Sequence, residues 1–194
     1  NLSYLTWAKK NLNELPVVLD DYSQSEDLNP YFLLSTFSKK LKEEDIVVTS
    51  DGSAVVMTFQ TFDVKHNQRL YSNSGSASMG YGLPASIGAA IDSDKNVYCI
   101  EGDGSIMMNL QELQTLIANN LNIKILLIEN GGYLSIKQTQ QNFYDGNFIG
   151  CDENSGLPFP EFKNIFNSFG FNVFHVSKTK ELENTLDNFL KEEG

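Results

Sequence analysis

The sequence predicts an α/β fold: a doubly wound, mostly parallel sheet with helices on both faces. Three short apolar segments, at 46–50, 96–100 and 123–128, have the composition of strands, and stretches with helical periodicity lie between them. The last of the three, Ile-Lys-Ile-Leu-Leu-Ile, is typical of a strand covered on both sides. Strands that alternate with helices favour a parallel sheet, and ligands of such sheets bind at the carboxyl ends of the strands.

The chain opens with a segment, 1–15, whose apolar residues recur with helical spacing. One side of this expected helix carries Leu2, Leu5, Trp7 and Leu12. The polar, acidic stretch 20–27 follows and has the composition of a linker. We therefore assign residues 1–28 to a helix and linker from a preceding domain and residues 29–194 to the domain proper, and we expect both ends of the chain to be truncated.

Capping residues and turns mark the helix starts in the first part of this domain. Asn29 followed by Pro30 suits the N-cap and first position of a helix that continues over 31–41. The turn at 51–53 directly follows the first strand and is expected to open another helix. The small residues of 72–82 predict a loop and not a strand.

The remaining elements repeat the alternation of helix and strand. A helix rich in alanine is expected over 83–91 and a longer one over 105–118. One face of the longer helix carries the apolar residues Ile106, Leu110, Leu113 and Ile117. A helix around 159–169, a strand at 171–176 and a helix at 178–190 complete the predicted series.

The composition excludes several classes of protein. Hydrophobic residues make up 41% of the 194 residues and charged residues 20%, a balance found in globular and not in disordered proteins. The net charge of −11 would repel a phosphate backbone, so we expect no nucleic-acid partner. No apolar run in the sequence approaches the roughly 18 residues that a membrane span needs, so no membrane contact is expected. Two cysteines, Cys99 and Cys151, are too few for a disulfide scaffold, and a cytoplasmic location is expected.

Three loops that follow predicted strands could carry chemistry: 50–53, 102–105 and 129–133. In the second loop, the two glycines allow a tight turn around Asp103 and the close approach of an anion to the backbone. Ser105 is then placed to cap a helix whose positive end favours phosphate.

Asp103 introduces a negative charge that a phosphate would repel. A divalent cation between the two groups removes this conflict, so Asp103 predicts a phosphate bound through a metal. Asn130, after the next strand, can supply a second oxygen ligand, and hard oxygen ligands suit Mg²⁺ or Ca²⁺ but not zinc. Gly, Asp and Asn are also the residues of ordinary tight turns, so each loop by itself is equally compatible with a structural role.

Taken together, the second and third loops resemble the thiamine diphosphate motif, which runs from Gly-Asp-Gly to a paired Asn-Asn. Three further segments, 78–90, 108–115 and 130–140, are similar to the large subunit of acetolactate synthase and its close relatives. The resemblance covers most of 45–176 and corresponds to the C-terminal, diphosphate-binding domain of that family, so it implies the thiamine diphosphate-binding fold. The one departure is Glu129, which stands where the family has the first Asn and adds a negative charge.

The resemblance also implies a role for each matching residue. Mg²⁺ would be held by the Asp103 carboxylate, the Asn130 side-chain oxygen and the Gly132 carbonyl oxygen. Met79 would prop the cofactor in its bent conformation, and the backbone of Ala77 and Met79 would bind its aminopyrimidine. The residues expected to contact thiamine diphosphate are Gly52, Ser53, Ala54, Ala77, Met79, Gly102, Gly104, Ser105, Asn130, Gly132 and Tyr133.

By this resemblance, the chain would be the C-terminal thiamine diphosphate- and Mg²⁺-binding domain of an acetolactate synthase-like enzyme. Such an enzyme decarboxylates a 2-oxo acid and transfers the resulting acyl-carbanion equivalent to an acceptor. The glutamate that activates the cofactor is expected on an absent domain, so no catalytic residue is assigned in this chain, and the chain alone is expected to be inactive. The resemblance further implies a homodimer or homotetramer, and it allows FAD on an absent domain.

Three alternatives stay open on the sequence. A simple 2-oxo acid decarboxylase of the same superfamily shares these loops. An NAD- or FAD-binding domain is an alternative because 80–85 matches the dinucleotide pattern G-x-G-x-x-A and Asp103 follows it. A catalytically inactive interaction module is the third, since Glu129 departs from the family pattern. By analogy with family members, in which the region after the metal site borders the active site, the segment 137–156 is expected to contact substrate or a neighbouring subunit.

Overall fold

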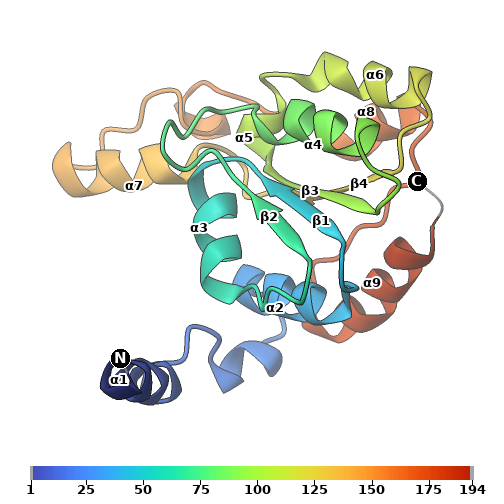
Figure 1. The fold of residues 1–194 in the computed structure, drawn as a ribbon. Coiled ribbons are helices and arrows are strands. Elements are labelled where there is room, and N and C mark those ends of the chain that lie inside the picture. The colour runs from blue at the N-terminus through green and yellow to red at the C-terminus, as the bar shows by residue number, and fades with distance from the viewer. Residues whose placement is uncertain (1, 193–194) are drawn as a thin grey trace.

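The computed structural model describes residues 2–192 and shows a four-stranded sheet with helices packed against it (Figure 1). The strands are β1 (Ile46–Thr49), β2 (Arg69–Tyr71), β3 (Val97–Gly102) and β4 (Ile123–Ile128). The strand order is β2-β1-β3-β4 and each pairing in it is parallel, so β1 and β3 are the interior strands. This confirms the predicted α/β fold with a parallel sheet. Residues 1 and 193–194, which belong to the expected first helix and domain, lie outside the described residues.

Helices connect the strands and continue beyond them. The N-terminal half contains α1 (Leu2–Glu14), the 3₁₀ helix η1 (Asp20–Ser23), α2 (Pro30–Lys40), α3 (Gly52–Thr61) and α4 (Gly82–Ile91). The C-terminal half contains α5 (Asp103–Ile106), η2 (Leu110–Glu112), α6 (Leu113–Ala118), α7 (Leu134–Phe143), η3 (Glu153–Ser155), α8 (Phe162–Ser168), η4 (Thr179–Glu181) and α9 (Leu182–Lys191). The start of α2 confirms the predicted cap, since the Asn29 side chain accepts a hydrogen bond of 2.9 Å from the Tyr31 N–H.

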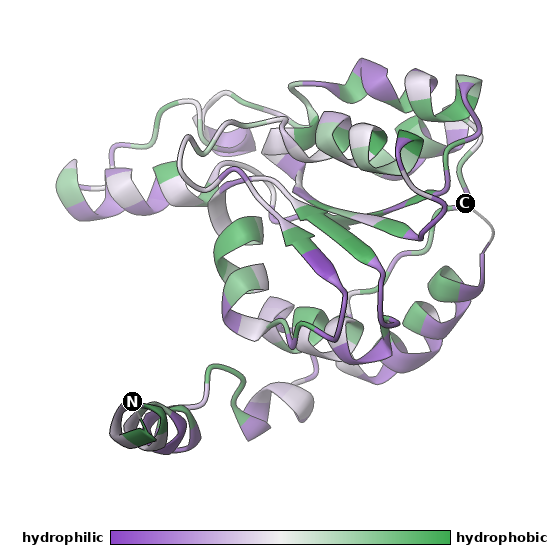
Figure 2. Ribbon diagram, in the orientation of Figure 1, coloured by the Kyte–Doolittle hydropathy of each residue, from purple (hydrophilic) through white to green (hydrophobic). Residues whose placement is uncertain are grey.

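The helices form two layers, one on each face of the sheet. In Figure 1, α4, α6 and α8 lie above the sheet, and α2, α3 and α9 lie below it. Side chains alternate along each strand, so Ile46 and Val48 of β1 belong to the core under the first layer, whereas Val47 belongs to the core of the second. Figure 2 shows the interior strands largely in green, the colour of apolar residues, whereas the edge strand β2 is partly purple. Burial on both faces explains the continuous apolar runs of the interior strands.

Helix α1 lies apart from the sheet and its two layers (Figure 1). It has no buried residue, and its apolar residues Leu2, Leu5, Trp7 and Leu12 are all exposed. Just before α2, the Leu28 N–H donates to the Ser177 carbonyl oxygen at 2.9 Å, which connects this part of the chain to the segment before η4. None of the helices within residues 2–192 is long and apolar enough to cross a membrane.

The helix predicted over 105–118 is interrupted, so this prediction is wrong at its centre. Helix α5 ends at Ile106, and the chain turns over 107–109 before η2 and α6 begin. Asn109 has φ −137° and ψ 32°, outside helical geometry, and its side-chain amide donates to the Gly80 carbonyl oxygen at 2.7 Å. An Asn side chain that binds backbone outside the helix competes with helical hydrogen bonding, which explains the break.

The segment 171–176 is not a strand, although its sequence predicts one. Phe171 and Val173 pack against one core and Val176 against the other, so the side chains alternate without a pairing partner. The opposite error concerns β2, which the sequence does not predict. This strand is three residues long, largely exposed, and pairs with β1 at the edge of the sheet, so its residues carry no hydrophobic signal.

Candidate functional site

The buried carboxylate of Asp103 joins the ends of the neighbouring strands β3 and β4. The side chain is 3% exposed, and its Oδ1 accepts a hydrogen bond of 2.7 Å from the Gly104 N–H. Its Oδ2 accepts three successive backbone N–H groups, those of Asn130 (3.0 Å), Gly131 (2.8 Å) and Gly132 (3.1 Å). Hydrogen bonds to an ionised carboxylate are stronger than those to a neutral acceptor. The structure therefore brings the loop with the expected acidic ligand against the loop with the expected amide ligand.

The Ser105 hydroxyl links two further loops to the same place. It lies 2.7 Å from the Ser50 hydroxyl, after β1, and accepts a hydrogen bond of 2.9 Å from the Gly80 N–H, before α4. The prediction that Ser105 caps a helix is wrong. Helix α5 begins at Asp103, and its N-cap is Gly102, which has no side chain to form a cap. The Ser105 side chain instead ties together loops at the carboxyl edge of the sheet.

A second buried carboxyl group, that of Glu101, lies beside these loops, and the sequence alone does not single it out. Glu101 is fully buried in β3, and its Oε1 accepts a hydrogen bond of 3.1 Å from the Leu83 N–H in the first turn of α4. Burial raises the pKa of the Glu101 carboxyl to about 7, whereas the Ser105 and Ser50 hydroxyls and the Leu83 amide lower it. The one signal in the sequence is a charged residue between an apolar strand and Gly-Asp-Gly.

The position of Glu101 argues against a dinucleotide-binding domain. In that alternative, a pyrophosphate would bind the helix N-terminus that follows Gly80 and Gly82. The Glu101 carboxyl group already occupies the first turn of α4, and a Cβ atom at Gly82 would overlap it. Asp103 is likewise engaged by the amides of 130–132, which takes it away from the role of a ribose ligand.

The first turn of α3 is the part of this edge best suited to an anion. Asp51 is the N-cap residue of α3 but makes no side-chain capping hydrogen bond, so the N–H groups of Gly52, Ser53 and Ala54 lack that partner. Gly52 has φ +58°, and a Cβ atom there would meet no atom of the described residues within 4 Å. An open helix N-terminus of this kind favours a bound anion such as phosphate.

Ala77 and Met79 lie on a tightly turned loop before α4. Ala77 has φ +48°, a left-handed conformation that is uncommon for a residue other than glycine, and its N–H donates to the Asn73 carbonyl oxygen at 2.6 Å. Gly80 follows with φ +77°, and two side chains bind its backbone. Met79, which is half-buried, therefore sits between two segments of fixed backbone.

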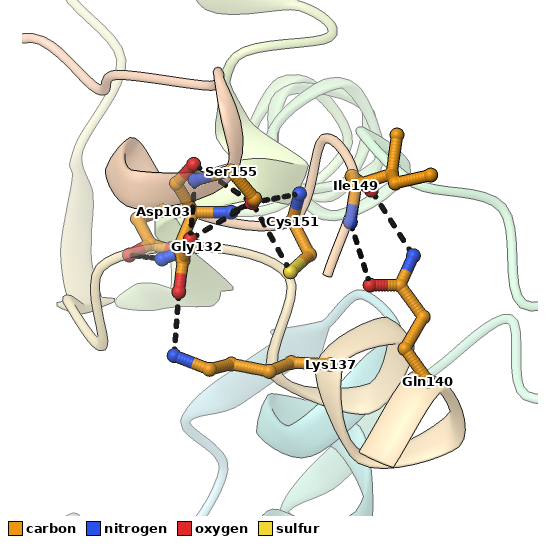
Figure 3. A network of polar contacts seen from close by, with 8 residues as sticks. Asp103, Gly132, Lys137, Gln140, Ile149, Cys151 and Ser155 are labelled. Carbon is orange, nitrogen blue, oxygen red and sulfur yellow. Dashed lines mark hydrogen bonds and ion pairs between the residues drawn. The ribbon is translucent and has the colours of Figure 1, made fainter. Parts of the chain in front are cut away.

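Gly132 is packed under a second loop, residues 150–156, as Figure 3 shows. It forms an antiparallel bridge with Asp152, and a Cβ atom at Gly132 would overlap the Cys151 carbonyl oxygen. The Lys137 Nζ atom lies 2.5 Å from the Asp152 Oδ2 atom. The hydrogen bond from Lys137 holds the pKa of the Asp152 carboxyl below its usual range. The loop 150–156 thus packs directly on Gly132, whose N–H binds Asp103.

Tyr133 contacts both the loop 150–156 and Gly104. Its N–H donates to the Cys151 carbonyl oxygen at 2.8 Å, and its ring lies against Gly104 so closely that a Cβ atom there would overlap it. The Phe159 ring packs edge-on against Tyr133, with 5.7 Å between the ring centroids. The contact between Tyr133 and Gly104 is a second link between the β3 and β4 loops.

The oxygen atoms at this edge fit a hard divalent cation. The Asp103 Oδ1 accepts one hydrogen bond and keeps lone-pair capacity for a metal. Asn130 is exposed on the adjoining loop, and the Gly132 carbonyl oxygen belongs to the same turn. No group of three His, Cys, Asp or Glu side chains within residues 2–192 is arranged as a metal site, so a metal here would rely on carboxylate, amide and carbonyl oxygens together.

Glu129, the departure from the family pattern, is exposed at the end of β4. Partial desolvation raises the pKa of its carboxyl group; the charges of Glu161 and Asp103 also raise it, whereas His175 lowers it. The N–H groups that reach Asp103 come from Gly104 and from residues 130–132, so the Asp103 cluster forms without Glu129.

The segment 137–156 includes most of α7, which projects from the body of the domain (Figure 1). The end of this helix and the chain after it surround a surface pocket of about 410 Å³, lined by Gln140, Phe143, Tyr144, Asp145, Asn147 and Ile149. Phe143 is 78% exposed at its rim. Contact of this segment with a substrate or another subunit stays a prediction.

Comparison with known proteins identifies the family. The family described as "Thiamine pyrophosphate enzyme, C-terminal TPP binding domain" matches residues 50–194, a range that contains the four loops around Asp103. The chain belongs to this family. Thiamine pyrophosphate is another name for thiamine diphosphate, so the match confirms the resemblance drawn from the loop motifs and makes the chain a thiamine pyrophosphate-binding domain.

Individual members similar to this chain are acetolactate synthases. It is 34% identical to the acetolactate synthase isozyme 2 large subunit of Escherichia coli (strain K12) over 155 residues and 33% identical to the acetolactate synthase large subunit of Cyanidium caldarium over 171 residues. It is 30% identical to acetolactate synthase 2, chloroplastic, of Zea mays over 175 residues. These matches cover 79%, 88% and 88% of the chain but 28%, 28% and 27% of the relatives. The chain thus spans less than a third of their length.

Proposed function

We propose that this chain is the cofactor-binding domain of an acetolactate synthase-like enzyme, which decarboxylates a 2-oxo acid and transfers the remaining acyl unit to an acceptor. The observation that carries the proposal is the bonding of Asp103 to the three amides of 130–132. It supports a common site for the carboxylate and the adjoining Asn130, in a chain that matches the thiamine pyrophosphate enzymes. Oxygen ligands from neighbouring strand ends can hold a cation that binds a diphosphate.

Mg²⁺ is the metal that this ligand set suits. Asp103 would supply a charged oxygen, Asn130 its side-chain oxygen and Gly132 its carbonyl oxygen, while diphosphate oxygens and water complete the shell. The diphosphate itself would lie between this metal and the first turn of α3. The residues that would surround it are Gly52, Ser53, Ala54, Gly102, Gly104, Ser105 and Tyr133.

The residues of this chain bind and orient the cofactor. Thiamine diphosphate, when bound, supplies an acidic thiazolium carbon and an electron sink for the loss of carbon dioxide from a 2-oxo acid. Met79 would support the bent conformation of the cofactor, and the backbone of Ala77 and Met79 would bind its aminopyrimidine. The activating glutamate is proposed to lie outside this chain, so none of its residues is assigned to proton transfer.

The complete enzyme is proposed to be a homodimer or homotetramer. Val56 and Phe59 expose about half of their surface on α3, the helix whose first turn would bind the diphosphate. Exposed apolar side chains beside a polar site support a subunit contact there. Any FAD would bind another domain. Cys99 and Cys151 are both buried and unpaired, which supports the reducing environment of the cytoplasm.

Thermal unfolding of the full-length protein tests the cofactor. We expect thiamine diphosphate with Mg²⁺ to raise Tm, because a ligand that binds only the folded state stabilises it. Thiamine diphosphate with a chelator, and NAD with Mg²⁺, should leave Tm unchanged. A rise with NAD would favour a dinucleotide-binding domain, and no rise with either cofactor would favour the interaction module.

Product analysis then tests the reaction. With pyruvate as the 2-oxo acid, a synthase joins the remaining two-carbon unit to a second pyruvate, whereas a simple decarboxylase releases acetaldehyde. We expect the joined product to predominate. Free acetaldehyde as the main product would identify a decarboxylase with the same cofactor site.

A further inference from the structure

The backbone of Gly80 is held on both sides by side chains from one turn of the chain. Its N–H donates to the Ser105 hydroxyl at 2.9 Å, and its carbonyl oxygen accepts the Asn109 side-chain amide at 2.7 Å. A Cβ atom at Gly80 would lie 2.6 Å from the Met108 Cβ and 2.8 Å from the Asn109 Nδ2. The segment 105–109 therefore contacts the N–H, the Cα and the carbonyl group of Gly80 at once.

These contacts at Gly80 determine the direction of the neighbouring Met79 carbonyl group. The Gly80 N–H and the Met79 carbonyl belong to one peptide group, which is planar and trans, so they point in opposite directions. The Met79 carbonyl is consequently directed away from the Ser105 hydroxyl. The Asn109 bond fixes the next peptide group, and the two bonds together hold Gly80 at φ +77°. Glycine by itself has little preference for one conformation, so the loop depends on these bonds.

We propose that Asn109 is a positioning residue, which acts with Ser105 through Gly80 to set the Met79 backbone for the ring portion of the cofactor. The inference rests on the proposed function, because that function gives Met79 its role. It also gives a reason for the break in the predicted helix over 105–118. Asn109 leaves helical geometry at the one place where its side chain reaches Gly80.

The Asn109 side chain binds the loop proposed to contact the cofactor ring, which is a different loop from those proposed to bind the diphosphate. Among the described residues, its side chain bonds to Gly80 and, at 3.5 Å, to Gln111. The Ser105 hydroxyl is also hydrogen-bonded to the Ser50 hydroxyl, so removal of the Asn109 amide leaves that contact in place. Loss of the amide should therefore loosen the loop at 77–82 and leave the anion-binding turns unchanged.

Amide hydrogen exchange of the full-length protein without cofactor tests the contact between Asn109 and the Gly80 backbone directly. We expect Asn109→Ala to speed amide exchange within residues 77–82 by about tenfold, the effect of one lost hydrogen bond. The matched control is Asn119→Ala, because the exposed Asn119 also donates its side-chain amide to a backbone carbonyl, that of Thr115 at 2.8 Å. Should the alanine variant fail to fold, Asn109→Asp removes the donor and keeps the shape. Unchanged exchange in a folded variant would overturn the inference.

Two titrations then separate positioning from general damage. We expect Asn109→Ala to raise the Kd for thiamine diphosphate with Mg²⁺ by about tenfold. The Kd for inorganic pyrophosphate with Mg²⁺ should stay within about twofold of the wild-type value, since that probe has no ring. Asn119→Ala should change neither value.

The outcomes distinguish this inference from the proposed function. Equal weakening of both ligands by Asn109→Ala would show a structural role and overturn the inference, as would wild-type affinity for both. Wild-type protein that binds neither ligand would overturn the proposed function and, with it, the role of Asn109.

Discussion

The Oδ2 atom of Asp103 lies 2.8 Å from the backbone nitrogen of Gly131, between hydrogen bonds of 3.0 Å and 3.1 Å from Asn130 and Gly132. One oxygen atom thus accepts hydrogen bonds from three successive N–H groups of the loop that follows the neighbouring strand. Successive N–H groups of this kind form an anion-binding concavity. Here the anion is part of the protein, so Asp103 shapes the loop that carries the other proposed metal ligands.

The substitution Asp103→Asn should therefore weaken the proposed metal site in two ways. It removes the charge that holds the loop 130–132, and it removes the charged metal ligand. We expect the affinity for thiamine diphosphate with Mg²⁺ to fall about 100-fold or more, measured by titration of the full-length protein. Asp27→Asn is the matched control, because Asp27 is an exposed carboxylate that pairs with Lys178 on the surface. A change of less than about fivefold in Asp103→Asn would remove Asp103 from the ligand set.

The turn at Gly132 predicts a contrast between two neighbouring glycines. Gly131 and Gly132 both have positive φ, +76° and +143°, but a Cβ atom would overlap the Cys151 carbonyl oxygen only at Gly132. Gly131→Ala should cost about 1 kcal/mol of unfolding free energy from backbone strain. Gly132→Ala should cost about 2 kcal/mol or more, because the loop 150–156 must also move. Denaturant unfolding measures both values, and equal costs would contradict the packing of this loop on Gly132.

The buried carboxyl of Glu101 predicts an unusual dependence of stability on pH. Burial raises its pKa to about 7 in the folded protein, whereas the unfolded chain ionises it near its ordinary value of 4.5. Between these values the folded state binds more protons, so this group makes the protein less stable as the pH rises from 4.5 to 7. Glu101→Gln removes the effect, and it should exceed the wild type in stability by up to about 3 kcal/mol above pH 7.

Urea unfolding between pH 5 and pH 8, without metal or cofactor, measures this difference. The advantage of Glu101→Gln should shrink as the pH is lowered toward 5. Glu43→Gln, at an exposed position, controls for the loss of one negative charge. A constant difference across the pH range would show that Glu101 does not titrate there.

The chain of 194 residues by itself is predicted to show no turnover of a 2-oxo acid. It spans less than a third of the acetolactate synthases that it resembles, and the proposed activating glutamate lies outside it. Release of carbon dioxide from labelled pyruvate measures the reaction, with the full-length protein as the positive control. Measurable release by the chain alone would show that its own residues activate the cofactor.

Much of the fold follows from local patterns in the sequence. The strands β1, β3 and β4 are predicted because burial on both faces requires continuous apolar runs. The cap at Asn29 is predicted because its side chain satisfies a backbone N–H two residues further along the chain. The start of α3 is predicted because a turn directly follows the first strand. The loops with Asp103 and Asn130 are marked by their glycines and by their place after strands.

The errors concern features that depend on distant parts of the chain. The break at Asn109 is set by Gly80, and the edge strand β2 exists through its pairing with β1. The pattern at 171–176 arises from side chains that pack into two cores, without a partner strand. Glu101 accepts a hydrogen bond from Leu83, at the start of a helix that precedes it in the chain, and this contact is not visible in the sequence.

The sequence by itself determined the type of fold and the place of the loops after the strands, because apolar periodicity and turn chemistry act over a few residues. It indicated the family through the resemblance of those loops to the thiamine diphosphate motif. Only the tertiary structure decided which groups meet: that Asp103 holds the amides of 130–132, that Ser105 faces inward to Ser50, and that Asn109 reaches Gly80. Hydrogen bonds depend on the relative positions of whole strands and helices in space, and those positions are settled by packing of the two cores.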